Sequence, residues 1–198
     1  PRDTIKYVLP ATEDAEAMKH AGAVSFHSWG GATPQQYNAW GDLAEKLKLP
    51  LIVAEAGVDP SAWNGGRYRA FEYGVREVQP YQELFLHARP QAVLLWEFTG
   101  DYALLNENRF DRRKELLTER FCFQKHWCDL IPAGSEALAA ASDNADVLFT
   151  AFRFAGDARV PGYTFHISNS KWARPVTVTG LPAGLKTLNA VRTSRGEM

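Results

Sequence analysis

Short β-rich segments alternate with helical segments along the first two-thirds of the chain, and this alternation limits the folds open to it. The β-rich segments lie at residues 4–9, 23–29, 51–55 and 91–98. Apolar residues at helical spacing, or helix start signals, follow them at residues 13–20, 33–47, 67–88 and 109–130. Four strands that are each followed by a helix predict an α/β fold with a parallel sheet covered by helices.

The pattern changes after residue 131, where Pro, Ala, Gly and Ser follow one another. Further β-rich segments are separated by turn residues and lie at 147–154, 162–169, 175–179 and 186–192. Their regular spacing predicts antiparallel strands. We therefore divide the chain into an α/β region of residues 1–131, a linker of residues 132–145 and an antiparallel β region of residues 146–198.

Composition and motifs exclude several classes of function. The 198 residues carry 22 Lys and Arg against 23 Asp and Glu, so we expect no nucleic-acid partner. No apolar run approaches the roughly 20 residues that a membrane-spanning helix needs, so we expect no membrane span. The chain has no glycine-rich phosphate-binding motif and no spaced set of metal ligands, which predicts neither a cofactor nor a metal.

Aromatic and charged side chains stand where the predicted strands end. The second strand ends in His27 and Trp29, the third in Glu55 and the fourth in Trp96. Because the carboxyl ends of parallel strands meet at one edge, we expect these side chains to lie close together. Indoles stack on sugar rings, and a carboxylate between aromatic walls suits glycosidic chemistry. Trp63, in the glycine-rich loop after the third strand, is a candidate for a further sugar platform.

On these residues the chain resembles the second half of a retaining glycoside hydrolase of the (β/α)8 clan A, which includes the cellulase family 5. Residues Leu51–Glu55 resemble the seventh strand of that clan, which ends in the catalytic nucleophile. His27-Ser28-Trp29 resembles the end of the sixth strand, and Leu95-Trp96-Glu97 the end of the eighth. The β region resembles the small β-sandwich of many such enzymes. The resemblance implies half of a TIM barrel, strands 5–8, followed by that sandwich.

The resemblance also implies a mechanism. Glu55 would attack the anomeric carbon of an oligo- or polysaccharide and form a covalent glycosyl-enzyme, with His27, Trp29, Trp63 and Trp96 binding the substrate. In the clan the acid/base is a Glu that follows Asn at the end of the fourth strand, which would lie upstream of this chain. We therefore expect these 198 residues to be inactive alone. The full-length enzyme is expected to be extracellular or periplasmic.

Two other classes of protein fit the same residues. A non-catalytic carbohydrate-binding protein would use Trp29, Trp63 and Trp96 without depending on Glu55. A compact α/β enzyme, complete at this size, would use Glu55 and His27 as an acid–base pair. That enzyme predicts a closed four-stranded sheet with helices on both faces. Half of a barrel predicts exposed apolar strand edges instead, with poor solubility or dimerisation.

Overall fold

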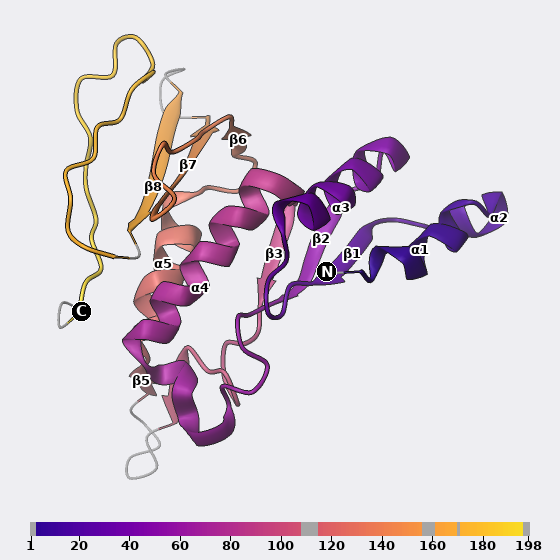
Figure 1. The fold of residues 1–198 in the computed structure, drawn as a ribbon, viewed down its shortest axis with the longest axis horizontal. Coiled ribbons are helices and arrows are strands. Elements are labelled where there is room, and N and C mark those ends of the chain that lie inside the picture. Colours follow the sequence, from indigo (N-terminus) through magenta and orange to yellow (C-terminus); the bar gives the residue numbers. More distant parts are fainter. Residues whose placement is uncertain (1–2, 108–114, 156–160, 170, 196–198) are drawn as a thin grey trace.

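The computed structural model describes residues 3–107, 115–155, 161–169 and 171–195 (Figure 1). It is a mixed α/β structure with parallel and antiparallel sheets. The helices are α1 (Ile5–Thr12), α2 (Ala15–Met18), α3 (Pro34–Leu47), the 3-10 helix η1 (Asn64–Arg69), α4 (Phe71–Glu83), its π-helical continuation η2 (Leu84–Ala88) and α5 (Glu119–Leu130). The strands are β1 (Val24–His27), β2 (Leu51–Ala56), β3 (Ala92–Leu95), β4 (Leu105–Glu107), β5 (Glu115–Leu117), β6 (Glu136–Leu138), β7 (Val147–Phe154) and β8 (Gly162–Asn169).

Three of the four strands expected in the α/β region form a parallel sheet in the order β1-β2-β3. Val24 lies opposite Leu51, and Ile52 lies opposite Ala92. The helix between the first two strands begins where the sequence predicts it. The Thr33 hydroxyl accepts from the backbone of Gln36, and the Gln36 side chain accepts from the backbone of Thr33. This reciprocal cap satisfies two backbone donors that the helix itself leaves unpaired.

The predicted strand at residues 4–9 is wrong, because this segment forms α1. A strand needs a neighbour for its backbone groups, whereas a helix pairs them within the segment. None of the side chains of α1 is buried, and Tyr7 is exposed at its surface. The described residues thus form three parallel strands rather than the four expected of a half barrel.

One face of the parallel sheet is covered by helices. Val24, Phe26, Leu51 and Val53 are buried against residues of α3, α4 and η2 in the main hydrophobic core. The opposite face carries exposed side chains, namely Ser25, His27 and Leu94. The compact-enzyme alternative required a closed four-stranded sheet with helices on both faces. In the described part of the chain, the parallel sheet instead has three strands, and helices cover one of its faces.

The antiparallel sheet contains only some of the strands that the sequence predicts, together with one that it does not predict. The expected strands β7 and β8 pair along their whole length, and β6 joins them within the residues assigned to a linker. The expected strands at 175–179 and 186–192 are irregular instead, and contain no sheet pairing. Pro175 and Pro182 remove backbone donors near these segments, which weakens a strand there. The structure therefore has one three-stranded sheet, and the β-sandwich is not confirmed.

The hairpin of β4 and β5 was not expected either, because the sequence pattern predicted a helix from 109 to 130. The helix α5 begins at Glu119, and part of the predicted range, residues 109–114, lies outside the described residues.

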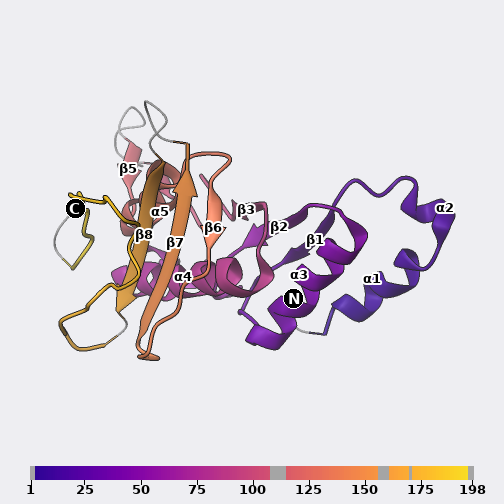
Figure 2. The same ribbon diagram turned by 90° about the horizontal axis from the view of Figure 1, so that it is seen from above.

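The antiparallel sheet lies beside α4 and α5, at the opposite end of the molecule from α1 and α2 (Figure 2). Phe152 of β7 and Trp127 of α5 belong to the same core as the parallel sheet. The Gln82 side chain on α4 donates to the carbonyls of Leu148 and His166. The α/β region and the antiparallel sheet thus share one core; the division into domains stays a prediction. None of the helices in the described ranges has the length and apolar character to cross a membrane.

Candidate functional site at the strand ends

The carboxyl ends of the three parallel strands lie side by side. His27 at the end of β1 is opposite Glu55 of β2, and the next residue, Ser28, donates its backbone N–H to the Glu55 carbonyl at 2.9 Å. The backbone N–H of Trp96, after β3, donates to the carbonyl of Ala56 at 3.2 Å. The structure therefore brings the three predicted strand ends to one edge.

A bulge in β2 decides which way Glu55 faces. Phe26 lies opposite Val53, but the next residue of β1, His27, lies opposite Glu55, so β2 holds one extra residue. Strict alternation would place Glu55 on the same side as the buried Leu51 and Val53. The extra residue, Ala54, breaks that alternation and brings Glu55 beside the exposed His27.

Two side chains hold the Glu55 carboxylate. Trp29 Nε1 donates to Glu55 Oε2 at 3.0 Å, and His27 Nδ1 lies 3.1 Å from the same oxygen. The Glu55 side chain is 29% exposed and that of His27 is 52% exposed. Both contacts fall on one oxygen, so they fix the orientation of the carboxylate while it remains open to solvent.

The Trp29 ring is itself fixed by packing. It lies 5.1 Å from the ring of Tyr102 and packs against a second core cluster, which consists of Ala62, Tyr68, Tyr73, Tyr102 and Ala103. On another side it meets Gly57, where a Cβ atom would come within 2.2 Å of the indole. Only a residue without a side chain lets the indole approach the backbone this closely.

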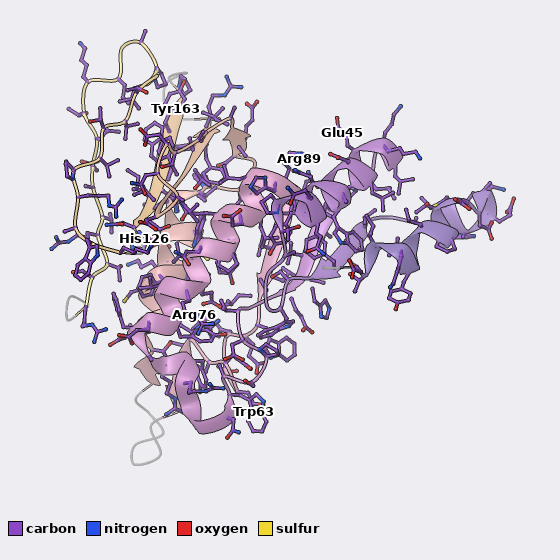
Figure 3. The ribbon with its side chains drawn as sticks, viewed as in Figure 1. Glu45, Trp63, Arg76, Arg89, His126 and Tyr163 are labelled. Carbon is purple, nitrogen blue, oxygen red and sulfur yellow. The ribbon has the colours of Figure 1, made fainter. Side chains whose placement is uncertain are left out.

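The two remaining aromatic candidates are more exposed. Trp96 follows β3, lies beside the end of β2 and is 40% exposed. Trp63 precedes η1 and is 55% exposed, at the end of the molecule where α4 begins (Figure 3). The strand ends thus gather His27 and Trp29 around the Glu55 carboxylate, with the backbone of Trp96 alongside. Trp63 is not part of that group.

A buried ion pair lies behind the strand ends, and the sequence analysis does not predict it. Arg120 of α5 donates to both carboxylate oxygens of Glu77 on α4, at 2.7 and 2.8 Å. The Gln124 side chain donates to the same carboxylate at 3.1 Å. Burial raises the pKa of Glu77, while the hydrogen bonds from Arg120 oppose that rise. Glu77 interrupts the apolar face that Tyr73 and Tyr81 define at helical spacing, and that interruption is the sequence signal for a buried partner.

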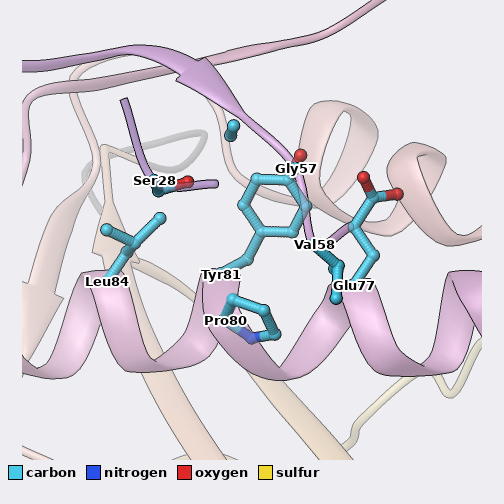
Figure 4. Close-up of a pocket in the computed structure, with 8 residues that line it drawn as sticks. Ser28, Gly57, Val58, Glu77, Pro80, Tyr81 and Leu84 are labelled. Atoms are coloured by element: carbon cyan, nitrogen blue, oxygen red, sulfur yellow. The ribbon is translucent and has the colours of Figure 1, made fainter. Parts of the chain in front are cut away.

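The space between this ion pair and the strand ends is filled. A small hollow there has no room for a water molecule (Figure 4). Its lining comes from the ends of β1 and β2 and from α4 and η2, namely Ser28, Ala56, Gly57, Val58, Glu77, Pro80, Tyr81 and Leu84. A ligand of Glu55 therefore has to approach from the exposed face of the sheet, where His27 lies. Within the described ranges, no three His, Cys, Asp or Glu side chains gather in a way that would hold a metal ion.

No family model matches this chain, and no curated protein matches it. Among solved structures, it is similar to a GH30 endoxylanase from Clostridium papyrosolvens C71, with a TM-score of 0.56 and 16% identity. It is also similar to SrfJ from Salmonella typhimurium, with a TM-score of 0.58 and 14% identity. A conserved exported protein from Bacteroides fragilis matches with a TM-score of 0.50 and 10% identity.

These likenesses concern the fold. The matches cover 75%, 76% and 75% of this chain, in the order given, and 34%, 36% and 35% of the other chains. The chain thus spans about a third of the length of the solved structures that it matches. Its fold is similar to part of a glycoside hydrolase, while membership of clan A or of cellulase family 5 is not confirmed.

Proposed function

We propose that this chain carries the nucleophile side of a retaining glycoside hydrolase site, with Glu55 as the nucleophile. The observation that carries the proposal is the contact of one Glu55 oxygen with Trp29 at 3.0 Å and His27 at 3.1 Å, on the open face of the sheet. A nucleophilic carboxylate has to be oriented toward the anomeric carbon and reachable by the sugar. The two contacts hold the Glu55 carboxylate in one orientation, and its side chain is partly exposed, which supports the assignment.

The surrounding side chains suit a saccharide. The half-exposed indole of Trp96, which follows β3 at the same sheet edge as Glu55, offers a flat apolar face, and sugar rings stack on such faces. His27 is exposed next to the carboxylate and has a hydrogen-bonding ring edge for a sugar hydroxyl. Trp63 is exposed in the loop after β2, apart from the strand ends, and offers a separate aromatic face. We assign these residues to substrate binding, and Trp29 to binding and to the orientation of Glu55.

We further propose that the parallel sheet is part of a (β/α)8 barrel. The sheet is open on the face that carries His27 and Leu94, and the similar solved structures are about twice as long as this chain. In such an enzyme other βα units would close that face into the barrel interior and leave the carboxyl ends of the strands, with Glu55, open to the substrate. They would also supply the acid/base carboxyl, about 5–5.5 Å from Glu55. The exported neighbour is in keeping with an extracellular or periplasmic enzyme.

The proposal is tested by covalent labelling of the 198-residue chain. An epoxyalkyl glycoside of a xylo- or cello-oligosaccharide carries an electrophile that a sugar-directed carboxylate opens, with the carboxylate oxygen bonded to the epoxide carbon and the epoxide oxygen taking a proton from water. Intact-mass analysis should show one added label, and peptide mapping should locate it on Glu55. The variant Glu55→Gln should stay unlabelled, while Glu83→Gln, at a carboxylate that pairs with His87 on α4 and η2, should label like the parent chain.

The same reagents separate the alternatives. Sugar binding that Trp96→Ala abolishes, without any labelling of Glu55, would favour the non-catalytic binding protein. Robust hydrolysis by the 198-residue chain, lost in Glu55→Gln, would contradict the need for an upstream acid/base. An absence of both labelling and sugar binding would overturn the proposed function.

A further inference from the structure

Arg120 occupies an unusual place for a charged side chain. It lies on α5, its side chain has no exposed surface, and its guanidinium also stands 5.4 Å from the centre of the Tyr73 ring. A buried guanidinium is stable only when its donors are paired. Glu77 takes two of these donors, so the question is what the remaining donors hold.

The remaining donors reach the backbone next to the strand ends. Arg120 Nη1 donates to the carbonyl of Tyr102, and Nη2 donates to the carbonyl of Trp96 at 3.3 Å. The planar guanidinium has a fixed fork of donors, so one side chain sets the spacing between these two carbonyls and Glu77. Trp96 directly follows β3, and Tyr102 lies further along the same loop. Arg120 thus joins α4, α5 and this loop.

Tyr102 carries the connection to Glu55. Its ring lies 5.1 Å from the Trp29 ring, and its hydroxyl donates to the carbonyl of Asp59 at 2.9 Å. The Trp29 indole N–H donates to Glu55. Movement of the Tyr102 backbone would therefore move the surface on which Trp29 rests.

We propose that Arg120, held by Glu77, is a positioning residue that sets the Trp96 and Tyr102 backbones and, through Tyr102 and Trp29, the orientation of Glu55. Its catalytic consequence rests on the proposed glycosidase function, but the positioning itself does not. Arg120 has no contact with Glu55, so it acts only through the groups that it holds.

The test compares two buried polar sites that share α4. Glu77→Leu with Arg120→Met removes the ion pair as a whole and leaves no buried charge behind. The matched control is Gln82→Leu, because Gln82 is fully buried five residues further on and binds β7 and β8 instead of the strand-end loop. Both variants are made in the 198-residue chain.

The readout is the indole N–H signal of Trp29 in a nitrogen–proton NMR spectrum, assigned with Trp29→Phe. In the double variant we expect this signal to move upfield and its exchange with solvent to quicken about fivefold, as for the loss of one ordinary hydrogen bond. In Gln82→Leu the Trp29 signal should stay in place. The indole signal of Trp40, buried in the main core, reports in each spectrum that the chain is folded.

The outcomes separate the proposal from the proposed function. An unmoved Trp29 signal in the double variant, or an equal movement in Gln82→Leu, overturns the positioning role even if the parent chain is labelled at Glu55. If the parent chain is not labelled but Trp29 moves in the double variant alone, the positioning stands and the glycosidase function fails. If the double variant does not fold, Tyr102→Leu removes the ring against Trp29, together with the hydroxyl that binds the Asp59 carbonyl, and has to give the same movement. An unmoved signal there overturns the proposal.

Discussion

The helices α4 and α5 pack against the strand ends on one side and against β7 and β8 on the other, and the two interfaces are built differently. Toward the strand ends, Arg120 and Gln124 donate to the Glu77 carboxylate, and Arg120 also donates to two backbone carbonyls at the strand ends. Toward the antiparallel sheet, Trp127 and His166 stack with their ring centres 4.2 Å apart. Neither His166 Nε2 nor Trp127 Nε1 has a hydrogen-bond partner among the described residues.

The two interfaces contribute to the structure in different ways. Directional hydrogen bonds specify where a backbone lies, so the strand-end interface fixes geometry. The interface with the sheet has the hydrogen bonds of Gln82 to Leu148 and His166, but it also has stacked rings, which contribute apolar area and tolerate sliding. We therefore expect it to contribute stability more than geometry. The two interfaces should therefore respond differently to substitution and to pH.

The largest effect is expected at the strand-end interface. Arg120→Met leaves the Glu77 carboxylate buried without its cation, and such a change costs about 3–5 kcal/mol of folding free energy. Urea denaturation at pH 7 measures that loss. Adding Glu77→Leu should restore much of it, because the double variant has no unpaired charge. Equal losses in the single and the double variant would mean that the ion pair does not act as a unit.

The interface with the antiparallel sheet should weaken in acid. Burial, with a smaller contribution from nearby His126, lowers the pKa of His166 from 6.5 to about 4 in the folded chain. His166 is therefore neutral when folded, whereas the unfolded chain takes up a proton below pH 6.5. The contribution of this lowered pKa to the free energy of unfolding is fully present above pH 6.5. It falls by about 3 kcal/mol as the pH is lowered from 6.5 to 4.

The variant His166→Phe isolates this contribution from that of the carboxyl groups. Phenylalanine keeps a ring between Trp127 and Phe152 but carries no titrating group. Urea denaturation measures the free energy of unfolding at pH 7 and at pH 4. The loss between the two pH values should be about 3 kcal/mol smaller in the variant than in the parent chain. The same acid loss in both proteins would show that the imidazole is not held neutral.

The two interfaces also differ in how far the sequence predicts them. The helix α3 is predictable because Thr33 and Gln36 cap it locally, and β7 and β8 are predictable from their alternating pattern. The pairing of Arg120 with Glu77 joins residues 43 positions apart, so no local pattern reveals the partner. Only the interruption of an apolar helix face by a glutamate marks one half of the pair.

The strand-end site shows the same limit. The sequence places His27, Glu55 and Trp96 at strand ends, and the structure brings those ends together. The bulge at Ala54 that turns Glu55 toward His27 depends on pairing with both neighbouring strands, and it leaves no signature in β2 itself. The prediction of a strand at residues 4–9 is wrong for a related reason. Whether this segment forms a strand or a helix depends on a neighbouring strand that the sequence pattern does not identify.

The smallest predicted effect compares the strand-end site with the antiparallel sheet through a pair of glycines. A Cβ at Gly57 would come within 2.2 Å of the Trp29 ring, and one at Gly162 within 2.3 Å of the Phe154 ring. Gly57→Ala and Gly162→Ala should each cost about 1–3 kcal/mol, as overpacking does, and thermal unfolding measures both. Gly57→Ala alone should also displace the Trp29 indole from Glu55 and move its N–H signal, because that ring is held by a directional hydrogen bond. If Gly162→Ala moves the Trp29 signal as far, the antiparallel sheet transmits geometry to the site, and the contrast between the two interfaces fails.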